Sequence, residues 1–430
     1  MFVSLGATNE DTLNSTSDGS WGVRGQILLW FAMGAWNLKN ALRNMARSPR
    51  WTDLKWLIVG YVSWAAVSIA WSSDPTLSAR RLVEFLMILV GAVGIGAGYY
   101  GTKADGVALY CWHLMMCGVS AAVSIVIYVA ATELTPASLL DTHWLPAIHP
   151  KAGEFNYAIC CAIVPAVYLY SKRPRGLVLF SLPIVTALSI LRFRAAPLFA
   201  VLVSVAIVLL VRKKHAAVMA LGVLAVVMIY FQSSSGESSV LAQLGQLLPS
   251  FGQDSGTVQG LNGRVTLWES LLEYAGSHPL RGYGFGAFWN DSRMRDLWML
   301  VGWAAPVGHN GYLDELLCTG AVGLALLLAF WLRAMQHSYK CLMAGSTAGA
   351  LVFCCLQYTL LLNTTDSFFQ AFFRLPFYAP LVALFALLAQ RPDPAPTSRR
   401  SRLGLHMLSG YTHRQAPIAI YPRPDFSLHE

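Results

Sequence analysis

Residues 195–211 read AAPLFAVLVSVAIVLLV, without one charged side chain. About 20 such residues in an α-helix cross the roughly 30 Å hydrocarbon core of a bilayer, so this stretch predicts a membrane-spanning helix. A weaker candidate covers residues 25–38. Similar apolar runs recur on both sides, at residues 56–73, 85–102, 106–132, 155–171, 176–191, 216–237, 316–332, 341–365 and 375–390. The predicted fold class is therefore all-α, a polytopic integral membrane protein with about 11–12 transmembrane helices.

The composition supports the same class. Of the 430 residues, 55% are hydrophobic and 12% are charged, whereas soluble domains carry about 25% charged residues. Residues 1–22 are polar and lack the order of a cleavable signal peptide, so none is expected. The eight cysteines lie in or beside apolar runs, which indicates buried thiols rather than a disulfide framework or a zinc site.

Basic residues fall on two predicted faces. Short basic loops mark the cytoplasmic side, and alternation of the spans puts residues 43–55, 172–175, 212–214 and the tail from 391 there. The net charge of +9 thus reflects membrane orientation rather than nucleic-acid binding. The opposite face receives ten basic residues, nine of them arginine: Arg80, Arg81, Lys151, Arg192, Arg194, Arg264, Arg281, Arg293, Arg295 and Arg374.

These outer-face arginines need a reason other than orientation. The planar guanidinium suits phosphate, although each arginine can instead pair with a nearby acid, as Arg80 or Arg81 could with Asp74. Arg192 and Arg194 stand between two spans, close to the headgroup plane, where a lipid phosphate is the simplest partner. Membrane lipid is therefore an expected partner.

The polar stretches divide the chain into five predicted parts. Within the third part, periodicity predicts helices over 265–275 and 291–301, joined by a turn-rich loop at 281–286. The parts are a polar N-terminal segment (1–22), a first transmembrane block (23–232), a long external loop with short helices (233–310), a C-terminal transmembrane block (311–390) and a cytoplasmic tail (391–430).

The external loop carries the candidate chemistry. Arg264 directly follows Gly263 at the expected start of a helix, and a helix N-terminus together with a guanidinium favours a phosphate. His309 precedes the 316–332 run, where a neutral imidazole can take a proton from a hydroxyl near neutral pH. Alternatively, His309 caps or packs against the helix that follows.

Three alternating glycines, Gly282, Gly284 and Gly286, lie in the same loop. They lack the Lys-Ser/Thr of a phosphate-binding P-loop. They therefore predict a tight turn in which the backbone approaches a ligand or another helix. Together, the arginines and the histidine suit a pyrophosphate leaving group on a lipid: the arginines would neutralise developing charge, and neither a metal nor another cofactor is expected.

These features resemble the O-antigen ligase family, within the larger group that also holds O-antigen polymerases and bacterial O-oligosaccharyltransferases. The resemblance covers residues 50–390. It is carried by Trp71-Ser72-Ser73-Asp74-Pro75 with Ser78 and Arg80, by Arg194 at the head of a span, by Asn262-Gly263-Arg264 with Trp268, by Pro279 with the three glycines, and by His309-Asn310-x-x-Leu313 with Gly320 and Gly323.

The resemblance implies an inverting, metal-independent glycosyltransferase with the C-type membrane fold, facing the periplasm from the bacterial inner membrane. It would transfer polysaccharide from an undecaprenyl-pyrophosphate-linked glycan to lipid A–core oligosaccharide without ATP. By motif match, His309 would be catalytic. The pyrophosphate would be bound by Arg80, Arg194 and Arg264, with Arg192 adjacent; further candidates are Arg81, Arg281, Asn310 and Gly284.

Three alternatives remain open. A polymerase shares the donor but more often has two large external loops, and protein O-oligosaccharyltransferases often carry an extra external C-terminal region. A transporter or flippase for an anionic lipid belongs to another class, and would bury charges within its spans and interrupt its helices near the midplane. The apolar runs of this chain are nearly charge-free, which favours the ligase.

Overall fold

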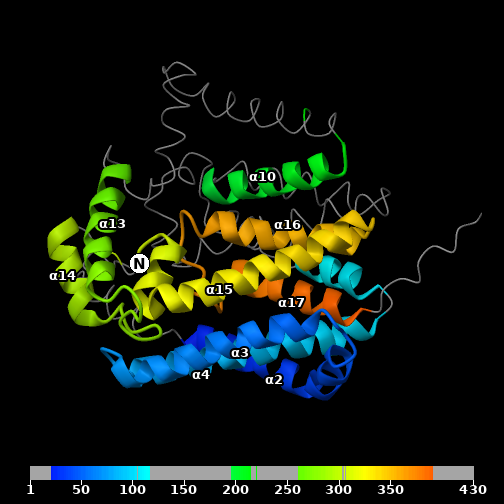
Figure 1. The fold of residues 1–430 in the computed structure, drawn as a ribbon, viewed down its shortest axis with the longest axis horizontal. Coiled ribbons are helices and arrows are strands. Elements are labelled where there is room, and N and C mark those ends of the chain that lie inside the picture. Colours follow the sequence, from blue (N-terminus) through cyan, green and yellow to red (C-terminus); the bar gives the residue numbers. More distant parts are fainter. Residues whose placement is uncertain are drawn as a thin grey trace, which may run out of the picture. The chain divides into compact units, whose positions relative to one another are not determined.

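The computed structural model describes residues 21–103, 105–116, 195–214, 219, 260–302, 305 and 307–390. Every regular element in these ranges is a helix, which confirms the all-helical prediction for this part of the chain (Figure 1). Three helical stretches are long and apolar enough to cross a membrane: Trp51–Trp71, Pro75–Thr102 and Gly311–Met343. The spans predicted at 155–171 and 176–191, the part of the 106–132 span after residue 116, the 216–237 span apart from residue 219, and the tail from 391 lie outside the described residues.

The N-terminal helices are α2 (Trp21–Met45), α3 (Trp51–Val67) and α4 (Pro75–Val93). A 3-10 turn, Ser68–Trp71, extends α3, and α4 continues through a π-helical segment, Gly94–Tyr99, and a second 3-10 turn, Tyr100–Thr102.

Helix α4 begins ten residues before the predicted span at 85–102. Two start signals explain this: Pro75 occupies the first turn, and the Asp74 carboxylate accepts a hydrogen bond from the Leu77 N–H at 2.9 Å. The prediction began too late because the charged residues of the first turns interrupt the apolar run. Those residues pair with one another on the helix surface, so they do not end it.

The remaining helices are α10 (Ala195–Val211), α13 (Gly260–Ser277), α14 (Asp291–Val301), α15 (Gly311–Met343), α16 (Thr347–Leu362) and α17 (Leu375–Ala389). Helix α10 matches its predicted apolar run end to end, α17 matches within one residue, and α14 confirms the short helix expected at 291–301. Helix α13 begins earlier than the predicted residue 265, so Arg264 lies inside it rather than at its start.

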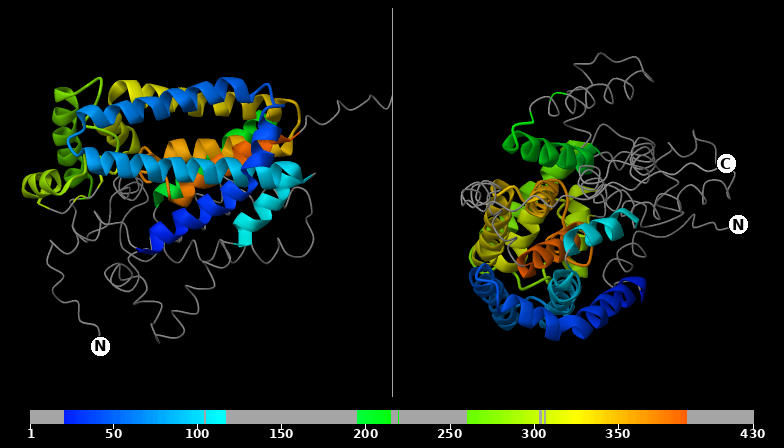
Figure 2. Two further views of the ribbon diagram at one scale, coloured as in Figure 1. Left: turned by 90° about the horizontal axis from the view of Figure 1, so that it is seen from below. Right: turned by 90° about the vertical axis from the view of Figure 1, so that its right-hand side faces the viewer.

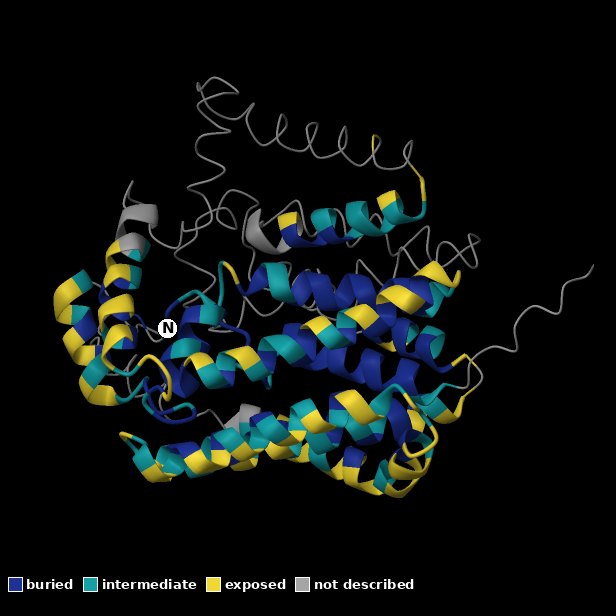
Figure 3. Cartoon of the chain, viewed as in Figure 1, coloured by how far each residue is buried: buried dark blue, intermediate teal, exposed yellow. Residues whose placement is uncertain are grey.

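The core lies where the membrane-type helices meet. Helix α16 packs against α10, α15 and α17, α3 lies against α15, and α2 packs against α4 and the π-helical segment (Figures 1 and 2). The buried positions concentrate in α16 and α17, whereas α2, α3 and α4 alternate buried with exposed positions (Figure 3). The ring of Trp30 in α2 stacks on the ring of Tyr378 in α17, with centroids 4.0 Å apart.

Candidate functional site

His309 lies in a short segment between α14 and α15, with its backbone in the left-handed region at φ 49°. A non-glycine residue in this region costs roughly 1–2 kcal/mol and persists only where neighbours hold it. On its N-terminal side, the Gly308 N–H donates to both carboxylate oxygens of the buried Asp314, at 3.0 and 3.2 Å. On its C-terminal side, the Asn310 amide oxygen caps α15 by accepting hydrogen bonds from the backbone N–H groups of Tyr312 and Leu313.

The turn after α16 holds the far side of the same segment. The Gly311 N–H donates to the carbonyl oxygens of Asn363 and Asp366, both at 2.8 Å. The guanidinium of Arg264 donates to the carbonyl of Thr365 in that turn, at 3.1 Å. Arg264 and Gly311, which lies two residues after His309, are therefore anchored on one turn, although Arg264 and His309 are 45 positions apart in the sequence.

Helix α13 reaches both flanks of His309. Trp268 lies one helical turn after Arg264, and its indole N–H donates to the Gly308 carbonyl at 2.7 Å. The prediction that Arg264 stands at a helix N-terminus is wrong, because Gly263 is accommodated inside α13; glycine in a helix interior costs only about 1 kcal/mol. Anion binding by Arg264 thus depends on its side chain alone.

The glycine-rich loop is joined to an interruption of α15. Gly320 has φ 70° and ψ −177°, which breaks the helical ladder. The Tyr283 N–H donates to the Leu317 carbonyl at 2.9 Å, and the Ala321 N–H donates to the Pro279 carbonyl at 2.8 Å. The loop therefore replaces hydrogen bonds that the break removes from α15, as backbone groups in a membrane require.

Close approach explains the glycines of the loop. A Cβ at Gly282 (φ 63°) would lie 2.6 Å from the Gly320 nitrogen, and one at Gly284 (φ 103°) would lie 2.7 Å from the Cα of Ser72. The sequence prediction that the backbone approaches another helix here is confirmed. The neighbour of Gly284 is Ser72, at the end of the 3-10 turn that extends α3. This glycine is therefore explained by close packing against a helix end.

The Trp71–Pro75 motif docks on the same loop. The Ser73 N–H donates to the Tyr283 carbonyl at 2.9 Å, and the Trp71 indole N–H donates to the Arg281 carbonyl at 3.1 Å. The side chain of Arg281 is exposed. Two motifs that carry the family resemblance, more than 200 residues apart, are therefore in direct contact.

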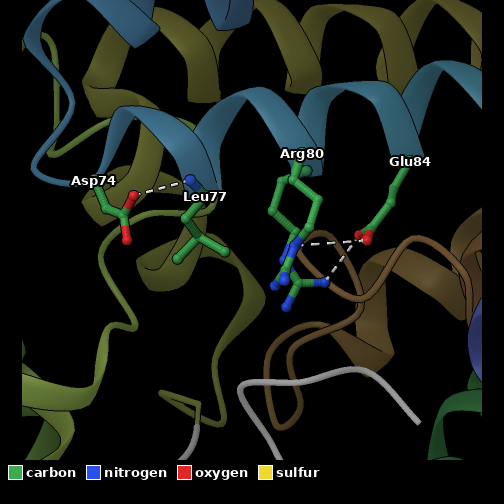
Figure 4. A network of polar contacts seen from close by, with 5 residues as sticks. Asp74, Leu77, Arg80 and Glu84 are labelled. Atoms are coloured by element: carbon green, nitrogen blue, oxygen red, sulfur yellow. Dashed lines mark hydrogen bonds and ion pairs between the residues drawn. The ribbon is translucent and has the colours of Figure 1, made fainter. Parts of the chain in front are cut away.

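Arg80 and Arg81 lie on the first turns of α4 and share one acid. Arg80 Nε lies 3.9 Å from Glu84 Oε1, and Arg81 Nη1 lies 3.4 Å from Glu84 Oε2 (Figure 4). The expected pairing of Asp74 with either arginine is wrong, because the Asp74 carboxylate caps α4 instead. The Arg80 side chain is 37% exposed, and ion pairs at this exposure contribute about 0–1 kcal/mol. An anionic ligand could therefore compete with Glu84 for it.

Arg293, one of the arginines predicted on the outer face, makes its contacts within the protein. Its guanidinium donates to Ser73 Oγ at 3.0 Å and to the Phe288 carbonyl at 3.2 Å, and stacks 4.3 Å above the Tyr283 ring. Burial lowers the pKa of Arg293 from its usual range. This residue holds α14 against the loop and the Trp71–Pro75 motif.

Two acidic residues are buried in the structure but were not predicted as site residues from the sequence. Asp314 and Glu315 lie in the first turn and a half of α15, both fully buried. Glu315 accepts hydrogen bonds from the Tyr61 hydroxyl at 2.8 Å, from the Thr319 hydroxyl at 2.6 Å and from the Gln370 amide. The expectation of nearly charge-free spans is wrong for α15, because the predicted run at 316–332 begins after these acids. Asn310, as a helix-capping residue, was the signal that could have placed the start earlier.

Of the remaining candidate residues, Asn310 and Arg81 have structural contacts, and Arg192 and Arg194 are not described. Asn310 caps α15, and the stem of Arg81 lies against Gly286, 2.8 Å from a Cβ at that glycine. Arg192 and Arg194 lie outside the described residues, so their part in the site stays a prediction.

The helices and this outer network define a helical, multi-pass membrane protein whose sequence motifs converge around one loop. Residues 157–328 match the family model described as O-antigen ligase, which confirms the resemblance over this segment. The matched segment includes Arg192, Arg194, Arg264 and His309 but ends before α16.

One curated relative matches a shorter stretch. The exopolysaccharide production protein ExoQ of Rhizobium meliloti (strain 1021) is 32% identical over 128 residues. The alignment covers 29% of this chain and 26% of ExoQ, so the chain matches about a quarter of that relative's length. The class that these comparisons support is an O-antigen ligase or polymerase type of membrane protein.

Proposed function

We propose that this protein is an O-antigen ligase. It transfers polysaccharide from undecaprenyl pyrophosphate to lipid A–core oligosaccharide on the periplasmic face of the inner membrane. The observation that carries the proposal is that Arg264 and Gly311, two residues after His309, both donate hydrogen bonds to the 363–366 turn, within a chain whose central segment matches the O-antigen ligase family.

The arginines act on the donor in this proposal. Arg80, Arg192, Arg194 and Arg264 bind the pyrophosphate, whose charge grows as the bond to the sugar breaks. Guanidinium groups aimed at that developing charge stabilise the transition state more than the ground state. Arg80 supports this role because its side chain is 37% exposed and its Nε lies 3.9 Å from Glu84 Oε1, a long ion pair.

His309 acts on the acceptor. Its imidazole takes the proton of the attacking hydroxyl while that oxygen bonds to the anomeric carbon, opposite the departing pyrophosphate. The carbon–oxygen bond to pyrophosphate breaks in the same step, so the anomeric configuration inverts. The imidazolium then returns its proton to solvent. The strained backbone of His309 supports this role, since such strain clusters at functional sites.

The test is reconstitution of the purified protein with undecaprenyl-pyrophosphate-linked glycan and lipid A–core, without metal or ATP. Glycan should appear on lipid A–core, and His309→Ala should abolish transfer. His278→Ala is the matched control. His278 is also predicted on the outer face, but the proposal gives it no role. Transfer by His309→Ala at the wild-type rate would remove His309 from the mechanism.

Donor binding tests the arginines separately. Arg194→Ala and Arg264→Ala should each weaken binding of the undecaprenyl pyrophosphate donor by at least about tenfold, the effect of losing one charge-assisted contact. Lys151→Ala should change donor affinity less. Equal affinity for all three variants would refute the pyrophosphate assignment.

A polymerase is the second candidate, favoured by the similarity to a protein of exopolysaccharide production. A polymerase would use a second lipid-linked glycan as the acceptor. A protein O-oligosaccharyltransferase would be the third variant of the same chemistry. In the reconstitution, longer lipid-linked glycan in place of modified lipid A–core would identify the polymerase.

A transporter or flippase for an anionic lipid is the candidate of another class, favoured by the broken, acid-bearing α15. In such transporters, the unwound backbone groups bind the cargo. Here, protein donors occupy them: Tyr283 holds the Leu317 carbonyl, and the Trp64 indole holds the Thr319 carbonyl at 2.8 Å. This occupancy favours the enzyme, and donor movement without a covalent product would favour transport.

A further inference from the structure

Asp314 is a buried carboxylate whose hydrogen bonds converge on the residue before His309. It is fully buried at the start of α15. Its two oxygens both accept from the Gly308 N–H, and Oδ1 also accepts from the indole N–H of Trp289 at 3.1 Å. Burying a carboxyl group is costly unless donors compensate it, and these N–H groups supply hydrogen bonds to Asp314 in this position.

Gly308 and Asp314 fit one another closely. A Cβ at Gly308 would lie 2.5 Å from Asp314 Oδ1 and 3.0 Å from a methyl carbon of Leu271. Only glycine therefore lets the Gly308 N–H come so near the carboxylate. The contact fixes the peptide plane that precedes Gly308.

Trp268 fixes the next peptide plane, because the Gly308 carbonyl that accepts its indole N–H belongs to the plane containing the His309 nitrogen. With that plane held, the φ of His309 decides where its Cβ projects, and the imidazole extends from that Cβ. The observed φ of 49° lies in the left-handed region, which costs a non-glycine residue roughly 1–2 kcal/mol, so the chain leaves it when the hold is released.

We infer that Asp314 is a positioning residue for His309. It fixes Gly308, and thereby keeps the His309 backbone left-handed and the imidazole aimed at the acceptor hydroxyl. Asp314 acts through Gly308 and contacts no substrate. The inference rests on the proposed role of His309 in transfer, and extends it to the residue that determines the direction of the imidazole.

The first measurement does not depend on transfer. The rate at which diethyl pyrocarbonate modifies His309 in the full-length protein, followed by mass spectrometry, reports the exposure and direction of the imidazole. Asp314→Asn keeps the shape but loses one of the two acceptor oxygens. It should change that rate by at least about threefold, as expected when a residue leaves a strained conformation. Trp289→Phe, the matched control, removes another donor to Asp314 but leaves the Gly308 contact.

The second measurement separates positioning from binding. Asp314→Asn should lower kcat on the order of 100-fold, the cost of misplacing a reacting group by about 1 Å, with the KM for the donor unchanged. Trp289→Phe should leave both constants near the wild-type values. Should Asp314→Asn fail to fold, Trp268→Phe removes the other hydrogen bond to Gly308 and carries the same expectations.

An unchanged His309 modification rate in Asp314→Asn would overturn the inference, as would equal effects of Asp314→Asn and Trp289→Phe on rate and kcat. If the wild-type protein transfers no glycan, the proposed function fails. The modification rates would still decide whether Asp314 directs His309, so the two failures are distinguishable.

Discussion

Replacing Gly320 by alanine should weaken the fold more than any other single methyl group added to the described part of α15. Gly320 adopts φ 70° and ψ −177°, a region populated almost only by glycine. A Cβ there would overlap the Leu280 carbonyl and lie 2.5 Å from the Arg281 nitrogen. Both neighbours are backbone of the inserted loop, so no side-chain rotation can relieve the overlap.

The expected loss has two parts. Alanine in this backbone region costs about 1–3 kcal/mol. The loop must also retreat, which lengthens the hydrogen bonds from Tyr283 to Leu317 and from Ala321 to Pro279. Each buried polar group that loses its partner costs roughly 1–3 kcal/mol. We therefore expect Gly320→Ala to lose at least about 2 kcal/mol of stability, since at minimum one of these hydrogen bonds must break.

The assay is unfolding in mixed micelles titrated with sodium dodecyl sulfate, followed by circular dichroism. Gly60→Ala is the matched control in another membrane-type helix, because a Cβ at Gly60 would meet only a Leu326 methyl at 3.6 Å, an ordinary contact. It should stay within about 1 kcal/mol of wild type. If Gly320→Ala unfolds at the same detergent fraction as Gly60→Ala, the insertion of the loop into α15 is not as described.

Two further substitutions use the same titration. Glu315→Gln puts an amide donor where the Gln370 amide donates to a carboxylate, so stability should fall by about 1–3 kcal/mol; an unchanged midpoint would mean that the acid is not held by these donors. His309→Gly should be more stable than His309→Ala by about 1–2 kcal/mol, because glycine tolerates the left-handed backbone. Equal stability of these two variants would argue against that backbone.

Much of the helical fold could be predicted because apolar runs report burial in lipid directly. Residues 195–211 coincide with α10, and residues 375–390 with α17. The starts of α4 and α15 were misplaced because polar residues occupy their first turns. Asp74 and Asn310 cap these helices, which makes the polar turns helical despite their low hydropathy.

The candidate site was predictable as a set of residues but not as an arrangement. Arginine and histidine types indicated anion and proton chemistry, yet nothing in their spacing indicates that Arg264 and the segment after His309 contact the same turn. The burial of Asp314 and Glu315 could not be predicted from the sequence either, because it depends on distant residues. Glu315 is tolerated only because Tyr61 and Gln370, 254 and 55 positions away, supply its donors, and a hydropathy window counts none of these contacts.

The loop at 279–288 explains why the family motifs occur together. Its first half supplies the hydrogen bonds that the break at Gly320 takes from α15, and its second half supports the Ser72–Ser73 backbone at the base of α4, which carries Arg80. Since α15 also begins at the segment holding His309, a shift of this loop would move the arginine and the histidine relative to each other. A substitution in the loop could therefore impair transfer without contacting either substrate. For that reason, loss of activity after substitution of a glycine in this loop indicates a direct catalytic role only if the modification rate of His309 is unchanged.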